Sequence, residues 1–93
     1  MIRGKEAAEK WSKALDLPEE QALPCVVAFA CLRYHGKSFV RKLAAGDGKV
    51  TTWQSLKIAV ALFLWNRATK KDPWGEMYRI TKFAQKWKEG DSI

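Results

Sequence analysis

The chain has 93 residues, of which 47% are hydrophobic and 12% aromatic, and seventeen basic against ten acidic residues give it a net charge of +7. This length predicts a single domain over residues 1–93, and the apolar content excludes a largely disordered chain. Two cysteines are too few for a disulfide scaffold. The net charge favours an anionic partner, although it says nothing about the fold.

The lengths of the apolar runs in the sequence indicate whether the protein can enter a membrane and in which compartment it is expected. The two longest, Cys25–Leu32 and Ile58–Trp65, have eight residues each, whereas a membrane-spanning helix needs about 20. No apolar stretch of signal-peptide length follows Met1. We therefore expect a cytoplasmic or otherwise intracellular protein whose thiols stay reduced.

A first amphipathic helix is predicted from about Lys5 to Leu15. Its apolar side chains recur at helical spacing and form one stripe. The stripe consists of Ala7, Trp11, Ala14 and Leu15.

The second predicted helix contains the first apolar run. Asp16, with Glu19 three residues later, is typical of a capping box. Pro24 fits best at the first position of a new helix, where its missing N–H costs nothing. The run Cys25–Leu32 is then apolar on all sides, and Gly36 supplies a helix stop. Its alanine and cysteine content favours a buried helix over a buried strand.

A short third helix is expected to follow, with Ser38 as its cap. Arg41 and Lys42 point outward from it. The inward positions hold Phe39, Val40, Leu43 and Ala44.

Gly46–Gly48 ends this helix and also permits a different structure. A hairpin across this turn would pair Phe39–Leu43 with Val50–Trp53. A half-buried strand alternates apolar and polar residues, and the adjacent Arg41 and Lys42 break that alternation. We therefore favour helices over an α+β fold.

The longest helix is predicted from about Thr52 to Lys70. Thr51 and Gln54 have the spacing of a capping box at its start. Within it, Ile58–Trp65 is apolar on every side and is expected to run through the centre of the fold.

A last helix is predicted to begin at Asp72 and Pro73, a capping residue followed by a good first-turn residue. Gly90 ends it, and residues 91–93 are expected to fray. Its inner face is expected to hold Trp74, Met77, Ile80, Phe83, Ala84 and Trp87. The sequence thus predicts a compact all-α bundle of four to five helices, with Cys25–Leu32 and Ile58–Trp65 as its buried helices.

The positive charge is concentrated in the middle of the chain. Nine basic residues and one acidic residue lie between Arg33 and Lys71, while the segments on either side are close to neutral. Cations next to short hydroxyl and amide side chains suit contacts with phosphates and base edges. The candidate nucleic-acid-binding residues are Arg41, Lys42, Lys49, Thr51, Thr52, Gln54, Lys57, Arg67, Lys70 and Lys71.

The segment from Ser38 to Lys70 has the order helix, glycine turn, helix, which superficially suits a helix-turn-helix. The run Ile58–Trp65 is too apolar for a helix that enters a DNA groove. We interpret the segment as ordinary helix packing.

The five tryptophans fall into two sets. Trp11, Trp65 and Trp87 lie on predicted inner stripes and are expected in the core. Trp53 and Trp74 lie at helix starts, where an exposed ring could stack on an unpaired base or anchor a protein interface. We favour rings folded back onto the core.

No pattern of catalytic or metal-binding residues is present. His35 is the single histidine and lies at a helix end. Cys25 and Cys31 are six residues apart, which on a helix places them about 240° around the axis, so they cannot bridge each other or share a metal. We predict a protein without catalytic residues, metal or cofactor.

The leading hypothesis is a small non-enzymatic module that binds DNA or RNA through phosphate contacts from the basic face Arg33–Lys71. The alternative is a protein–protein interaction domain that uses exposed tryptophan and the basic face. It would be a homo-oligomer, or a small inhibitor or adaptor of a larger partner. An acidic membrane surface is a less favoured partner.

Overall fold

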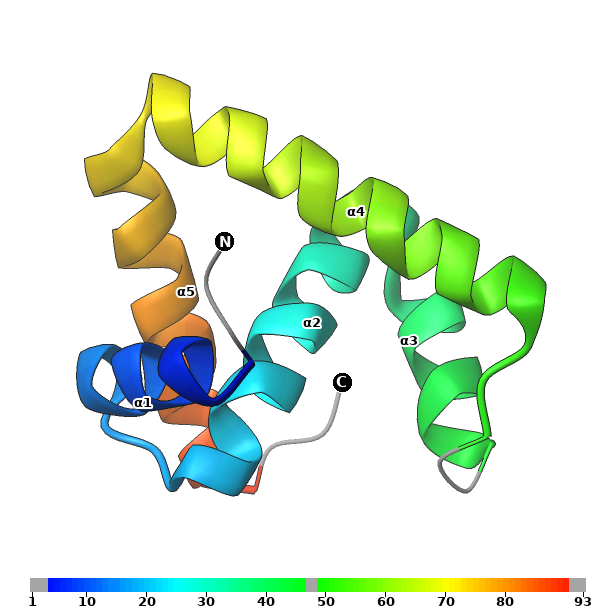
Figure 1. Ribbon diagram of the computed structural model, residues 1–93, viewed down its shortest axis with the longest axis horizontal. Helices are drawn as coiled ribbons and strands as arrows, with labels where there is room; N and C mark the ends of the chain where they lie inside the picture. Colours follow the sequence, from blue (N-terminus) through cyan, green and yellow to red (C-terminus); the bar gives the residue numbers. More distant parts are fainter. Residues whose placement is uncertain (1–3, 47–48, 91–93) are drawn as a thin grey trace.

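The computed structural model describes residues 4–46 and 49–90 and contains five α-helices, with no strand in these ranges (Figure 1). The prediction of an all-α bundle is therefore confirmed. The radius of gyration is 12.7 Å. The helices are α1 (Gly4–Leu15), α2 (Glu19–His35), α3 (Lys37–Ala45), α4 (Thr52–Lys71) and α5 (Pro73–Lys88).

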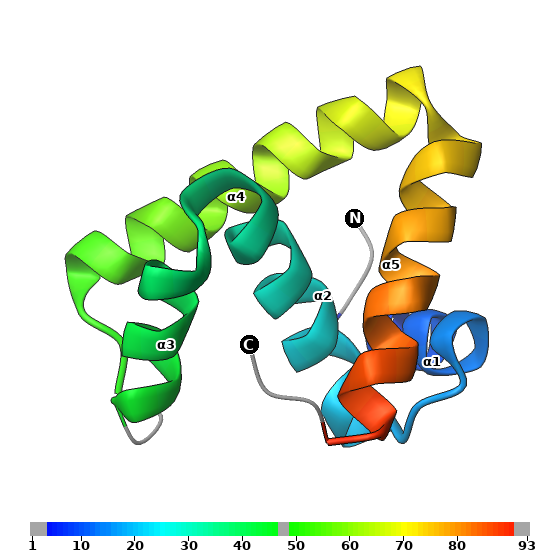
Figure 2. The same cartoon turned by 180° about the vertical axis from the view of Figure 1, so that it is seen from behind.

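Helix α2 is the centre of the bundle and packs against all four other helices. Helices α1 and α5 lie on one side of α2 and α3 on the other (Figure 1, and from behind in Figure 2). Helix α4 crosses over the top of the others. The prediction that Ile58–Trp65 runs through the centre is therefore wrong, because α4 is covered from one side only.

The core forms around two aromatic side chains, Phe29 of α2 and Trp65 of α4. Their ring centroids are 5.7 Å apart, and Trp11 lies 5.5 Å from Trp65. Phe83 packs on Phe29 at 5.5 Å and on Trp87 at 6.0 Å. The predicted core positions of Trp11, Trp65 and Trp87 are confirmed.

The start of α2 differs from the prediction. Its N-cap is Pro18, and no side chain caps it. Asp16 instead adopts a left-handed conformation, with φ of 54°, and pairs with Lys88 at 3.3 Å. Pro24 lies inside the helix. It removes only one hydrogen bond near the exposed helix start, while the buried Ala22 and Cys25 keep the segment packed as a helix.

The turn between α2 and α3 is a single glycine. Gly36 has φ of 91° and ψ of 174°, a conformation essentially restricted to glycine, and it ends α2 as predicted. Helix α3 begins directly at Lys37 without a side-chain cap, so the predicted Ser38 cap is wrong. Ala44 is exposed, contrary to its predicted inward position, and so is Ala14 of α1.

Other helix ends follow local sequence signals. Gly46 is the C-cap of α3, while Asp47 and Gly48 lie outside the described residues, as do residues 91–93, which were expected to fray. At the start of α4, the Gln54 N–H donates to Thr51 Oγ1 and the Thr51 N–H donates to Gln54 Oε1, each at 3.1 Å. The Asp72 carboxylate accepts from the Gly75 N–H at 3.1 Å and caps α5. Both predicted caps are confirmed.

Helix α5 buries a carboxylate where a tryptophan was expected. Glu76 is only 2% exposed, and it accepts from Trp65 Nε1 at 3.2 Å and pairs with Arg33 at 2.7 Å. Trp74, in contrast, is 87% exposed. At 100° per residue, Glu76 lies about 40° from the buried Ile80 and Trp74 about 120° away. The Glu76 carboxylate thus joins α2, α4 and α5.

Candidate functional site

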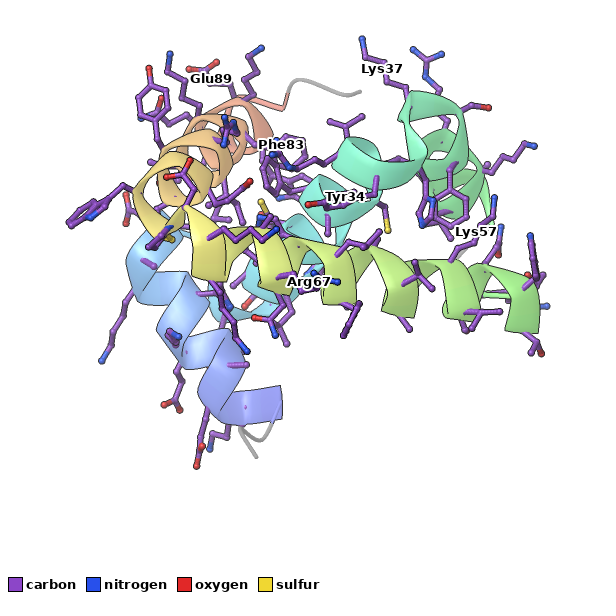
Figure 3. The ribbon with its side chains drawn as sticks, turned by 90° about the horizontal axis from the view of Figure 1, so that it is seen from above. Tyr34, Lys37, Lys57, Arg67, Phe83 and Glu89 are labelled. Atoms are coloured by element: carbon purple, nitrogen blue, oxygen red, sulfur yellow. The ribbon has the colours of Figure 1, made fainter. Side chains whose placement is uncertain are left out.

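The predicted basic residues form two separate groups rather than one patch. The proximal basic group, on α3 and near the start of α4, consists of Arg41, Lys42, Lys49 and Lys57. The distal basic group, at the C-terminal end of α4, consists of Arg67, Lys70 and Lys71. From Lys57 to Lys70 the helix rises about 20 Å. Figure 3 shows Lys57 and Arg67 on different turns of α4.

Most of these cations have no ion pair to a residue that the structure describes. Their side chains are exposed, and the sequence of α4 contains no acidic residue. Between described residues, ion pairs join Arg33 and Arg79 to Glu76, Arg79 to Asp72, and Lys88 to Asp16, and Arg41 also has an interaction partner. The members with no ion pair to another described residue are Lys42, Lys49, Lys57, Arg67, Lys70 and Lys71.

Two of the three neighbouring polar residues that were predicted to bind nucleic acid, Thr51 and Gln54, stabilise the start of α4. Thr51 and Gln54 bond to each other's backbone in the capping box, so their side chains hold the start of α4. Thr52 is exposed in the first turn. Of the predicted polar residues Thr51, Thr52 and Gln54, only Thr52 has a side chain that takes no part in this capping box.

Lys57 is the half-buried member of the proximal group. Its Nζ lies 5.2 Å from the ring centroid of Phe39 and 5.9 Å from that of Trp53, distances at which a cation is attracted to an aromatic ring. Its backbone carbonyl accepts a hydrogen bond from His35 Nε2 at 2.8 Å. Lys57 therefore holds α4 against α2 and α3. His35 is the last residue of α2, which confirms its predicted place at a helix end.

The outward face of α4 carries large apolar side chains. We call it the outer α4 stripe, and its members, between 36% and 65% exposed, are Trp53, Leu56, Val60, Phe63 and Leu64. Only Ala61 and Trp65 of this helix are fully buried. The predictions that Ile58–Trp65 is buried and that the ring of Trp53 folds onto the core are therefore wrong. The spacing of the stripe, with steps of three and four residues, was present in the sequence as a second apolar face.

Two aromatic side chains of α5 are exposed as well. The favoured burial of Trp74 is wrong, and this ring lies three residues beyond Lys71 of the distal basic group. Tyr78 is also exposed, and Lys82 Nζ lies 4.7 Å from its ring centroid. The chain segment from the end of α4 to the start of α5 thus contains three exposed cations and an exposed aromatic ring.

An apolar groove of about 580 Å³ lies on α2 beside α3 and the start of α4. Among the lining residues that the structure describes, Arg41 is the single charged one, and none carries a hydroxyl, amide or carboxylate side chain. A small-molecule site usually needs several placed polar groups to orient its ligand. The lining residues are Pro24, Val27, Ala28, Val40, Arg41, Leu43, Ala44, Val50, Ile58 and Trp87.

The cysteines are buried and unpaired. Burial raises the pKa of the Cys25 thiol to about 11 and also raises the pKa of Cys31. Both therefore remain protonated and weakly nucleophilic at neutral pH. The described residues contain no group of three or more His, Cys, Asp or Glu side chains placed to hold a metal ion, and none of their helices combines the length and hydropathy that crossing a bilayer requires.

Comparisons with models of protein families, with curated proteins and with solved structures find no match to this chain. Its activity must therefore be inferred from its own surfaces.

Proposed function

We propose that this chain is a small non-enzymatic module that binds nucleic acid, mainly through the phosphate backbone. The observation that carries this proposal is the set of exposed cations without ion pairs to described residues, on and beside a helix that has no acid. No described carboxylate pairs with these cations and offsets their positive potential. Their contact with phosphates releases counterions from the nucleic acid, which drives binding at low salt.

The distance between the two basic groups defines the size of the ligand. A separation of about 20 Å along α4 corresponds to roughly six base pairs of a duplex, at 3.4 Å per pair. One copy of the chain therefore contacts phosphates at two places, and a nucleic acid shorter than this reaches one group only. The exposed Trp74, three residues after Lys71 in the chain, adds a ring on which an unpaired base can stack.

The test is a titration of labelled 20-nucleotide single strands and duplexes, followed by fluorescence anisotropy between about 50 and 200 mM salt. The triple variant Arg67→Gln, Lys70→Gln, Lys71→Gln removes the distal group. It should weaken binding and lower the slope of log affinity against log salt by about one for each lost phosphate contact.

A matched control removes three cations of α1 through Lys5→Gln, Lys10→Gln and Lys13→Gln. The two triples carry the same net charge, so a specific basic surface predicts a smaller loss for the control. Equal losses of affinity in the two triple variants would mean that binding depends on the net charge and not on a particular basic surface. Absence of binding to every oligonucleotide at the lowest salt would refute the proposal.

A further inference from the structure

We propose that the outer α4 stripe is the interface of a two-fold symmetric homodimer in which the α4 helices of two copies pack antiparallel. The stripe and the basic groups are different observations, so this dimer does not depend on nucleic-acid binding. It accounts for the apolar side chains that the fold of one copy leaves uncovered.

The stripe is accessible along its whole length. Helix α4 crosses the top of the bundle, and the other four helices lie beneath it (Figures 1 and 2). Seen from above, the length of α4 lies open along the molecule (Figure 3). A second helix can therefore lie along this face without displacing any part of the fold.

The area of the stripe suits a second copy. Aromatic side chains such as Trp53 and Phe63 bury roughly 150–250 Å² each, and at the observed exposures the five residues present on the order of 500 Å² of apolar surface. Two copies facing each other would bury on the order of 1,000 Å², the size at which specific interfaces begin.

The stripe is also self-complementary, as a two-fold interface must be. Trp53, Leu56, Val60 and Phe63 follow one another at steps of three, four and three residues, which is the spacing of a helix-to-helix seam. An antiparallel register centred between Leu56 and Val60 places Leu56 against Val60 of the second copy. It also places Trp53 against Phe63 of the second copy, so aliphatic meets aliphatic and aromatic meets aromatic.

The width of the stripe favours a helix over a lipid surface. On a helical projection its members span about 100°. The small exposed Ala59 lies next to it on one side, followed by Asn66 and Ser55, and Lys57 borders it on the other side. A helix that lies in a bilayer interface presents a broad apolar face with cations along its polar side. In α4 the cations lie mostly toward the two ends, which leaves a narrow apolar seam between them.

Dimerisation would bring together the basic groups that a single copy keeps apart. In the antiparallel register, Arg67 of one copy comes level with Lys49 of the other. This combined surface would serve the proposed nucleic-acid binding. In the free protein, the like charges of the two copies repel each other across the interface. Salt screens their repulsion, so the dimer should become tighter as salt increases, whereas binding to nucleic acid should become weaker.

The first experiment is sedimentation equilibrium of the wild-type chain up to about 200 μM at low and high salt, without nucleic acid. We expect twice the 10.6 kDa monomer mass, with a smaller dissociation constant at high salt. Phe63→Glu should weaken the dimer at least about tenfold, because it places a charge in the seam. A wild-type chain that stays monomeric at every concentration and salt would overturn the proposal, whether or not it binds anionic vesicles.

Tyr78→Glu is the matched control, because Tyr78 and Phe63 are each 61% exposed and only Phe63 belongs to the stripe. The control should dimerise like the wild type. Circular dichroism should show that both variants keep their helices. Equal weakening by both would indicate non-specific apolar association and overturn the proposed interface.

Engineered disulfides test the direction of packing. The two substituted positions are ten residues apart, or about 15 Å along α4. A mixture of Trp53→Cys and Phe63→Cys chains should therefore form the mixed disulfide in the antiparallel dimer, while each variant alone should not. The native thiols are buried and protonated and should not interfere. Efficient disulfides within each variant alone would indicate parallel packing and overturn the antiparallel register.

Discussion

Helices α2 and α4 each contain an eight-residue apolar run, yet only that of α2 is enclosed by the fold. The run of α2 is surrounded by four helices. Three small side chains in it, Cys25, Ala30 and Cys31, have no exposed surface, and small residues let neighbouring helices approach closely on several sides. The run of α4 carries bulky side chains on the face away from α2. Apolar content alone therefore does not identify a central helix.

The largest expected effect contrasts one phenylalanine in each helix. Phe29→Ala in α2 should lower the free energy of unfolding by about 3–5 kcal/mol, because it opens a cavity beside Trp65 and Phe83. Phe63→Ala in α4, measured at concentrations too low for association, should change it by less than about 1 kcal/mol. Urea denaturation followed by circular dichroism measures both. Similar losses would show that the outer face of α4 is packed within the monomer.

A smaller loss is expected where α5 joins these two helices. Glu76→Ala removes the acceptor of Trp65 Nε1 and the partner of Arg33. Breaking a buried pair costs about 3–5 kcal/mol, and we expect the lower end of that range because Arg33 can reach water. Thermal unfolding should show the loss, with Glu89→Ala at an exposed position as the control. Wild-type stability of Glu76→Ala would mean that the carboxylate does not hold the helices together.

The smallest expected effect is a decrease of the free energy of unfolding at alkaline pH, caused by the Cys25 thiol of α2. Because burial raises the pKa of Cys25 from 9.0 to about 11, the unfolded chain releases this proton at lower pH than the folded chain does. This contribution to the free energy of unfolding is fully present below pH 9 and is lost as the pH rises toward 11. The loss at pH 11 is about 2 kcal/mol. The difference in unfolding free energy between wild type and Cys25→Ala should shrink by this amount. A constant difference from pH 8 to 11 would contradict the burial of this thiol.

Local signals in the sequence predicted the helix ends that depend on neighbours within three residues. The Thr51–Gln54 box, the Asp72 cap and the Gly36 stop all formed as expected. The predicted caps at Asp16 and Ser38 did not form. Each of these side chains had a plausible capping position, but the turns around Leu17 and Gly36 are set by how α1, α2 and α3 pack.

For the candidate site, the sequence located the excess charge, and the structure showed that it is divided into two groups and that Arg33 is paired. The spacing from Lys57 to Lys70 on one helix was enough to separate the two basic groups. The sequence could not show that Arg33 is paired with Glu76, because the two residues lie on different helices and meet only in the folded core.

By itself, the sequence determined the helical class, most helix ends and the concentration of charge between Arg33 and Lys71, because these depend on composition and on contacts between near neighbours. Only the tertiary structure decided that α2 is central, that Glu76 is inside and Trp74 outside, and that α4 has an uncovered apolar face. The physical reason is that a helix with apolar residues on several sides can bury any of them, and the packing of the other helices selects which side is covered.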